Sequence, residues 1–291
     1  MTISPTIHQA LRPLQSLLVC PICKGELAYF PTLIACTACQ ATFPQTVQGL
    51  FNVIPGHLLQ QDGNGWQTRQ LEMEVWYKEL LASPSEAASC FDCDYAPYAP
   101  ILSELSGSIL DLGGGNGIVR HFLSEGTEYI VLDPSLNWLG SAWAAIADRF
   151  SCLEERFNFV RGVGEYLPFP AGSFDHVLSF WSLNHVLQPE RVFQEVHAVL
   201  RPTGRFLIVL EDMEPHWREI DHLLSHFSEW SRKTDLIVSK VCSTLGARHW
   251  PLQKDHIRIR EADIAAWSSG RFAITTRQWI GQFLTYELCR L

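Results

Sequence analysis

The stretch "ILDLGGGNGIVRHF", Ile109–Phe122, decides the fold. The apolar pair Ile109 and Leu110 predicts the end of a buried strand, and the residues from Ile118 onward predict the first turn of a helix. Glycines at such a turn let the backbone approach a ligand where a Cβ would clash. The spacing is G-x-G-x-G, with Ile118 where a dinucleotide loop has its third glycine. The turn therefore predicts a ligand loop of another kind.

Strands and helices alternate along the chain from about residue 100, as in a parallel sheet with crossover helices. Only Gly281 and Gln282 separate the last two predicted strands, which must therefore pair antiparallel. We predict an α/β, Rossmann-like fold with a seven-stranded, mostly parallel sheet that ends in an antiparallel hairpin. The predicted strands are 108–111, 129–133, 157–162, 176–181, 205–212, 271–280 and 283–291. The predicted helices are 117–125, 137–150 and 189–200.

Composition and charge exclude several classes of protein. The 291 residues are 47% hydrophobic and 18% charged, as in a soluble globular protein. The net charge is −9 and no run rich in lysine or arginine occurs, so nucleic acid is not an expected partner. Apolar runs such as Phe206–Leu210 are too short to span a bilayer, so no membrane association is expected. The N-terminal residues do not resemble a secretory signal, and we expect a cytoplasmic protein.

Four of the nine cysteines form two C-x-x-C pairs, which are Cys20 with Cys23 and Cys36 with Cys39. Each pair can form a tight turn that directs two thiolates at one ion, and two such turns complete a tetrahedral zinc site. The alternatives are two disulfides, which are disfavoured without a secretory signal, or four buried thiols. We predict a zinc ribbon over residues 15–57, with the metal acting in folding only.

The segment between the ribbon and the second domain is predicted as a linker with a helix, residues 58–99. Within it, residues 71–81 have an amphipathic pattern, and residues 83–100 are predicted to be irregular. Cys90 and Cys93 form a third C-x-x-C without a partner pair, and their role stays open. Residues 100–291 form the main domain.

Four motifs in order make the main domain resemble the class I S-adenosylmethionine-dependent methyltransferases, in particular the small-molecule subgroup called type 11. These are "ILDLGGGNG", "YIVLDPS", "VRGVGEYLPFPAGSFDHVLSFWSLNHV" and "VLRPTGRFLIVLE". The ribbon resembles zinc modules on some rRNA guanine methyltransferases, which often use three cysteines and one histidine, whereas this chain offers four cysteines.

The resemblance implies S-adenosylmethionine as the cofactor and assigns its contacts. Asp133 would accept both ribose hydroxyls, and Asp111 would favour the ammonium group directly or through a water. Trp138 would lie against adenine, with plain core packing as the alternative. Val163 stands where the family commonly has an acidic residue, so backbone groups of Val163 and Gly164 would hold the adenine amine. The implied cofactor-binding residues are Asp111, Gly113, Gly114, Gly115, Gly117, Asp133, Pro134, Trp138, Val163, Gly164, Glu165, Ser179 and Phe180.

Polar and aromatic residues after the fourth predicted strand suggest the acceptor side. His185 is the candidate base, and a histidine that only bonds backbone at a helix start is an equal alternative. Glu211 and Asp212 are substrate contacts or helix caps. Tyr95 and Tyr98 would cover the cofactor or pack on the surface. A segment between the fifth and sixth strands, with His216, Trp217, His222, His226 and Trp230, is expected to cover the acceptor.

The predicted function is methyl transfer from S-adenosylmethionine to a small-molecule or lipid-like acceptor. An RNA or protein methyltransferase that uses the ribbon for recognition is the first alternative. A non-catalytic protein that binds the cofactor or a partner is the second. The sequence predicts neither the acceptor nor the oligomeric state.

Overall fold

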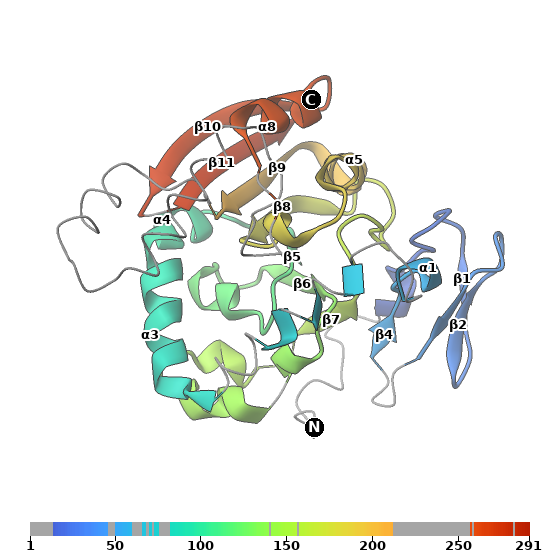
Figure 1. Ribbon diagram of the computed structural model, residues 1–291, viewed down its shortest axis with the longest axis horizontal. Coiled ribbons are helices and arrows are strands. Elements are labelled where there is room, and N and C mark those ends of the chain that lie inside the picture. Colours follow the sequence, from blue (N-terminus) through green and yellow to red (C-terminus); the bar gives the residue numbers. More distant parts are fainter. Residues whose placement is uncertain are drawn as a thin grey trace, which may run out of the picture.

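A computed structural model of the chain shows an α/β fold in which helices cover both faces of a central sheet (Figure 1). No helix in the part of the chain that the structure describes is both long and apolar enough to cross a membrane. The structure describes residues 14–45, 50–59, 66–67, 70–71, 73–75, 82–139, 141–155, 157–211, 257, 259–281 and 283–291.

The central sheet has eight strands among the described residues, in the order β10-β11-β9-β8-β5-β6-β7-β4. Strands β4 to β9 pair in parallel, whereas β11 pairs antiparallel with both β9 and β10. The mostly parallel sheet and its terminal antiparallel hairpin are as predicted. The strands are β4 (Phe51–Asn52), β5 (Ser108–Leu112), β6 (Glu128–Asp133), β7 (Asn158–Arg161), β8 (Phe174–Phe180), β9 (Leu200–Leu210), β10 (Phe272–Ile280) and β11 (Phe283–Arg290).

The predicted count of seven strands was one short. The additional strand, β4, comes from the segment assigned to the ribbon and pairs with β7 through Phe51 opposite Val160. Two paired residues give too weak a hydrophobic pattern to distinguish a sheet edge from a ribbon strand.

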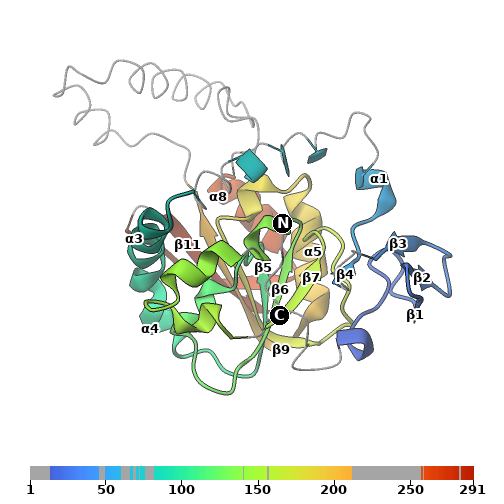
Figure 2. The ribbon, with the colours of Figure 1, turned by 90° about the horizontal axis from the view of Figure 1, so that it is seen from below.

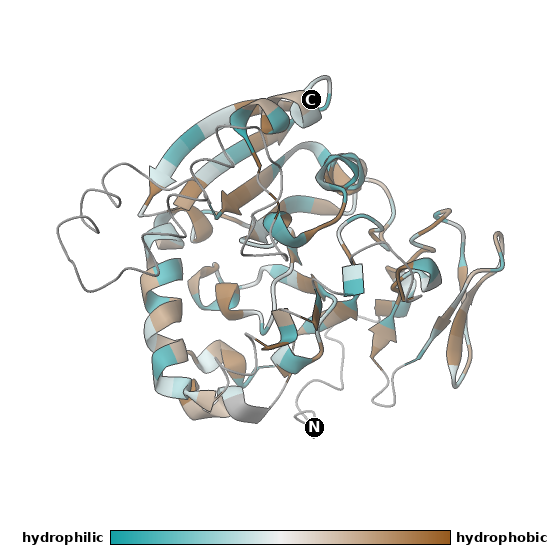
Figure 3. Cartoon of the chain, in the orientation of Figure 1, coloured by the Kyte–Doolittle hydropathy of each residue, from teal (hydrophilic) through white to brown (hydrophobic). Residues whose placement is uncertain are grey.

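Alternate residues of the inner strands face opposite layers of the molecule. Ile109 packs with Tyr98 and Leu102, next to helix α4 (Ala99–Leu102). Leu110 belongs to a buried cluster that includes residues of α5 (Pro189–Val199) and α8 (Glu261–Ser268). Burial on both faces explains the high apolar content of these strands. Figure 3 shows hydrophobic residues along the central strands and hydrophilic ones on the edge strand β10.

The segment 83–100 is helical, so the prediction of an irregular approach was wrong. Helix α3 (Pro84–Tyr95) is followed by a 3-10 helix (Ala96–Tyr98) and by α4. Proline at the first turn of a helix does not interrupt it, and Pro84 and Pro100 both occupy such positions. Phe91 of α3 packs against Trp143 and Phe150. Of the helix predicted at 71–81, residues 71 and 73–75 are helical and most others lie outside the described residues.

Two predicted crossover helices are 3-10 turns instead. The first spans Ile118–Phe122, and the second region contains Asn137–Leu139 and Ser141–Ile146. The first turn ends because Leu123 is extended. The predicted helix 189–200 is present as α5.

The N-terminal part forms a small antiparallel sheet of β1 (Leu27–Tyr29), β2 (Leu33–Cys36) and β3 (Thr42–Pro44), followed by the short helix α1 (Gly56–Leu59). Figure 2 shows this ribbon beside the edge of the central sheet that carries β4 and β7. Leu18, Ile34 and Phe43 belong to the same buried cluster as Leu110 and Phe169. The ribbon therefore shares its core with the main domain.

Candidate functional site

A cavity of about 400 Å³ opens at the carboxyl ends of β5, β6, β7 and β8. In open α/β sheets this is the edge at which ligands bind. The cavity brings together residues from separate predicted motifs, which are Gly113, Asp133, Pro134, Trp138, Val163, Gly164, Glu165, Ser179, Phe180 and His185. The other predicted cofactor residues, Asp111, Gly114, Gly115 and Gly117, lie outside its lining.

Asp111 is buried beneath the glycine loop. The Tyr129 hydroxyl donates a hydrogen bond of 2.5 Å to its Oδ2. Its Oδ1 is also buried and has no hydrogen-bond partner among the described residues. Burial raises the pKa of Asp111 to about 7. Oδ1 therefore offers an acceptor for a cationic group or a water.

The loop glycines are required by the protein's own packing. Gly113 has φ +69°, and a Cβ there would lie 2.4 Å from the Cβ of Ser182. Gly115 has φ +55°, and its Cβ would lie 3.0 Å from the Trp138 ring. The Ser182 hydroxyl donates to the carbonyl of Leu112 at 2.6 Å, which ties the loop to the end of β8. Ligand contact is therefore only part of the reason for these glycines.

Asp133 ends β6 at the cavity with only 2% of its surface exposed. Its Oδ1 accepts the Ser135 N–H at 2.7 Å, and its Oδ2 accepts the Gly115 N–H at 3.1 Å. Burial raises the pKa of this carboxyl to about 7, against the opposing effect of these hydrogen bonds. The carboxylate is thus fixed in orientation, and each oxygen keeps a lone pair for a further donor.

Glu165 lines the cavity but holds protein groups. Its Oε1 accepts the N–H of Leu187 at 2.7 Å and of Gln188 at 3.3 Å, at the start of α5. Arg191 donates to the Glu165 carbonyl at 2.7 Å. A carboxylate at a helix N-terminus satisfies unpaired N–H groups and stabilises the helix dipole. Glu165 therefore positions the start of α5.

The end of β8 contributes the other wall of the cavity. Trp181 has φ +54°, a conformation that bulky residues rarely adopt. His185 lies in a 3-10 helix, Leu183–His185, and its N–H donates to the Ser182 carbonyl. Asn184 exchanges two hydrogen bonds of 3.2 Å with the backbone of Glu211, which fixes the end of β9 beside β8.

Several lining residues were not predicted from the sequence. They come from the segment before the main domain and from the terminal hairpin, and they are Trp66, Gln70, Met73, Cys90, Phe91, Asp94 and Phe283. Cys90 and Asp94 are four residues apart on α3 and therefore lie on one face of the helix. Only a correct helix assignment would have revealed this shared face.

Tyr95, which was predicted to cover the cofactor or to pack on the surface, lines the cavity. Tyr98 is fully buried and shares a hydrogen bond of 3.2 Å with Thr285, so it belongs to the core and not to the surface.

The predicted acceptor-covering residues Asp212, His216, Trp217, His222, His226 and Trp230 lie outside the described residues.

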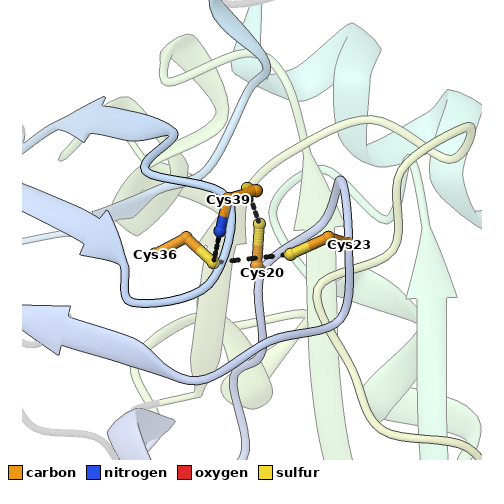
Figure 4. A group of neighbouring side chains, drawn as sticks. All are labelled: Cys20, Cys23, Cys36 and Cys39. Carbon is orange, nitrogen blue, oxygen red and sulfur yellow. Dashed lines mark hydrogen bonds between the residues drawn. The ribbon is translucent and has the colours of Figure 1, made fainter.

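Cys20, Cys23, Cys36 and Cys39 converge, with their Sγ atoms all within 4.8 Å of one another (Figure 4). The Cys23–Cys36 and Cys20–Cys39 sulfur pairs are 3.4 and 3.7 Å apart. Tetrahedral zinc with bonds of about 2.3 Å separates its sulfur ligands by about 3.8 Å. The arrangement therefore fits a tetrahedral ion.

The two cysteine turns have the same backbone path. Lys24 and Gln40, the residues after each pair, have φ +62° and φ +60°. Gly25 follows the first turn, and a Cβ there would lie 2.8 Å from the Cβ of Ala38 and 3.2 Å from the Cys36 sulfur. The matching turns and the close approach at Gly25 bring the two pairs together.

The first cysteine turn also docks on the main domain. Lys24 Nζ donates to the Leu167 carbonyl at 2.7 Å and pairs with Glu195 of α5 at 2.5 Å. Glu195 in turn accepts the Leu167 N–H at 3.0 Å. Val19 donates its N–H to the Pro168 carbonyl. The ribbon thus contacts the segment that follows Glu165.

Residues 110–208 match the family model described as "Methyltransferase domain". This part of the chain is similar to methyltransferase domains. The match covers the glycine loop, Asp133 and the β8 edge. It ends before the terminal hairpin and does not include the ribbon.

The curated relatives that the chain matches carry the names of methyltransferases, some of them uncharacterized. The chain is 38% identical over 103 residues to the ubiquinone/menaquinone biosynthesis C-methyltransferase UbiE of Methylobacterium nodulans, covering 34% of this chain and 40% of the relative. It is 31% identical over 140 residues to the malonyl-[acyl-carrier protein] O-methyltransferase of Marinomonas sp. strain MWYL1, covering 44% and 50%. The chain therefore spans half or less of the length of these relatives.

Among solved structures, the chain is similar to the 1,6-didemethyltoxoflavin-N1-methyltransferase of Burkholderia thailandensis, which was solved with its substrate and S-adenosylhomocysteine. The TM-score is 0.48 at 16% identity, and the similarity covers 91% of this chain and 99% of that one.

Proposed function

We propose that the protein transfers a methyl group from S-adenosylmethionine to a small-molecule or lipid-like acceptor. One observation carries the proposal, namely the buried carboxylate of Asp133 at the cavity, with each oxygen oriented by a backbone N–H. Two carboxylate oxygens with lone pairs to spare match the neighbouring hydroxyls of a ribose, and such charge-assisted hydrogen bonds are strong.

The remaining cofactor contacts follow from the lining of the cavity. Trp138 and Val163 would face the adenine, with Gly164 backbone groups as its polar partners. Gly113 would leave room for the methionine portion. The unpartnered Oδ1 of Asp111 would attract its ammonium group through a water, because Asp111 itself lies outside the lining.

The chain's own contribution to the reaction is orientation and proton handling. Bound S-adenosylmethionine supplies an electrophilic methyl group on a sulfonium, so the leaving group needs no acid. Rigid positioning of the acceptor in line supplies much of the acceleration. His185 would accept a proton from a hydroxyl or amine acceptor, since imidazole exchanges protons near neutral pH. Glu165 would act as a positioning residue through α5.

We further propose that Cys20, Cys23, Cys36 and Cys39 hold one structural zinc ion. The support is the sulfur spacing and the matched turns. Four thiolates leave no open coordination position, so the ion would act in folding. The sheet of β1, β2 and β3 is too small to form a core of its own, so the ion would add to the packing of the ribbon against the main domain.

Transfer of tritium from labelled S-adenosylmethionine into fractionated cell extract tests the function. The proposal predicts label in the small-molecule or lipid fraction. Label in RNA or protein would instead favour a macromolecular acceptor. The absence of label from every fraction, with S-adenosylhomocysteine still bound, would favour a non-catalytic protein.

A further inference from the structure

The cavity has an inner wall that the cofactor assignment leaves unused. It is formed by Asp94 and Tyr95 of α3, Trp181 after β8, Glu211 after β9 and Phe283 at the start of β11. The antiparallel register sets Leu284 opposite Leu210, so Phe283 and Glu211 are next to each other at one sheet edge. These elements lie far apart in the sequence.

Trp181 is at the centre of this wall. Its ring centroid lies 4.9 Å from Tyr95, 5.0 Å from Phe283 and 5.4 Å from Phe180, at interplanar angles of 80°, 60° and 71°. The backbone N–H of Trp181 donates to the Val209 carbonyl at 2.9 Å, beside the left-handed conformation of this residue at φ +54°. Such a conformation is unfavourable for a bulky residue and is retained where surrounding contacts enforce it, often at functional sites.

The wall carries negative charge. Burial raises the pKa of the Asp94 carboxyl, the hydrogen bond to Cys90 opposes this, and the nearby Glu211 carboxylate raises it further. The lining of the described cavity contains no lysine or arginine. A cation that enters this space would therefore relieve the repulsion between two carboxylates, whereas an anion would add to it.

Carboxylates and aromatic rings that line one space can form a recognition site for an organic cation. Aromatic rings attract ammonium groups, and the attraction is stronger when both are desolvated. We propose that the acceptor is a small organic amine, recognised as its ammonium cation by Asp94 and Glu211 with Trp181 and Tyr95 beside it. The ammonium nitrogen would pass one proton to His185 in the same lining, and its freed lone pair would then form the bond to the methyl carbon as the carbon–sulfur bond breaks. This inference rests on the proposed methyltransferase function and specifies its substrate class.

The test uses three probes that share a phenyl ring and differ in charge. They are 2-phenylethylammonium, 2-phenylethanol and phenylacetate, each titrated calorimetrically into the full-length protein saturated with S-adenosylhomocysteine. We expect the ammonium probe to bind at least about tenfold more tightly than the alcohol, and phenylacetate to bind most weakly. If 2-phenylethanol or phenylacetate binds the wild type as tightly as the ammonium probe, the inference is overturned.

The double variant Asp94→Asn/Glu211→Gln assigns the preference to these carboxylates. We expect its preference for the ammonium probe to fall to about threefold or less, with S-adenosylhomocysteine affinity retained. The control Glu125→Gln/Asp148→Asn removes two exposed carboxylates away from the cavity and should keep the full preference.

Two outcomes of the variant experiment contradict the inference. One is an unchanged preference in the double variant. The other is a loss of S-adenosylhomocysteine affinity, which would assign the carboxylates to the cofactor's own ammonium group. Failure of the wild type to bind S-adenosylhomocysteine would instead contradict the proposed function itself.

Discussion

The cysteine ribbon and the main cavity bring polar groups together in different ways. In the ribbon, two turns of identical spacing place four sulfurs within 4.8 Å, and all four ligands lie within twenty residues of sequence. In the cavity, Asp133, Trp181 and Glu211 come from the ends of three strands that the sheet order brings together, and Asp94 comes from helix α3. A site made by local turns is visible in a sequence, whereas a site made by topology appears only with the fold.

The largest expected effect is on the ribbon. Cys36→Ser removes one of four zinc ligands, and structural zinc contributes about 10–16 kcal/mol to the folding of small zinc domains. We expect the bound zinc to fall from one per chain to none by elemental analysis, with loss of amide protection in β1, β2 and β3. The control Cys93→Ser changes an exposed cysteine outside the cluster and should keep the metal. Wild-type protein with an intact ribbon and no metal would contradict the zinc site.

Gly113 of the glycine loop can be compared with Gly172, which lies elsewhere and also has a left-handed backbone conformation. Gly113 and Gly172 have φ +69° and φ +66°, but a Cβ would meet Ser182 at 2.4 Å in the first case and nothing within 4 Å in the second. Gly172→Ala should cost about 1–2 kcal/mol for the backbone alone. Gly113→Ala should cost about 1–3 kcal/mol more because of the clash. Equal losses in chemical denaturation would show that packing against Ser182 does not determine this glycine.

Cofactor affinity should depend on pH through Asp133. Burial raises the pKa of Asp133 to about 7 in the free protein. The ionised carboxylate offers two acceptor oxygens to the two ribose hydroxyls, whereas the protonated carboxyl loses one of them, so binding favours the ionised form. Affinity for S-adenosylhomocysteine should therefore rise about tenfold between pH 6 and pH 8. Asp133→Asn should bind weakly and lose the part of the pH dependence that Asp133 contributes, whereas Asp111, whose pKa burial also raises to about 7, keeps its own part. A wild-type affinity for S-adenosylhomocysteine that falls between pH 6 and pH 8 would contradict this prediction.

The smallest effect is expected where the ribbon meets the main domain. Lys24 pairs with Glu195 and also donates to the Leu167 carbonyl, but its side chain is 38% exposed. Lys24→Met should therefore lower the free energy of unfolding by only about 1 kcal/mol. Because Glu195 still holds the Leu167 N–H, affinity for S-adenosylhomocysteine should change by less than about twofold. A larger loss would mean that the ribbon supports the cofactor site, against the expectation that ribbon variants keep cofactor affinity.

Much of the fold could be predicted from the sequence because buried parallel strands give continuous apolar runs. The strands β5 to β11 overlap the predicted strands, although β9 begins at Leu200 and includes the residues predicted as a turn before it. Asp133 stands at the end of β6 in the cavity. Helix α3 and the two short helices after it were missed because Pro84, Pro97 and Pro100 suggest interruption, although each lies in the first turn of its own helix. Strand β4 was missed because two residues carry too little pattern.

The candidate site was predictable only in part, for a related reason. Asp133 and Gly113 belong to a contiguous motif, whereas Asp94 and Phe283 reach the cavity through the helix and the hairpin. The role of Glu165 depends on the position of the α5 N-terminus relative to β7, which no spacing in the sequence encodes.

The central claim is that the glycine loop and Asp133 hold S-adenosylmethionine, and equilibrium binding tests it most directly. Wild type and Asp133→Ala are titrated with S-adenosylhomocysteine and with NADH, which also places a ribose near an acidic residue after the second strand. We predict that the wild type binds S-adenosylhomocysteine and not NADH. Asp133→Ala should lose about 2–3 kcal/mol, a factor of about 30 to 150 in affinity. Tight binding of NADH without S-adenosylhomocysteine would contradict the claim, and unchanged affinity in the variant would remove Asp133 from the site.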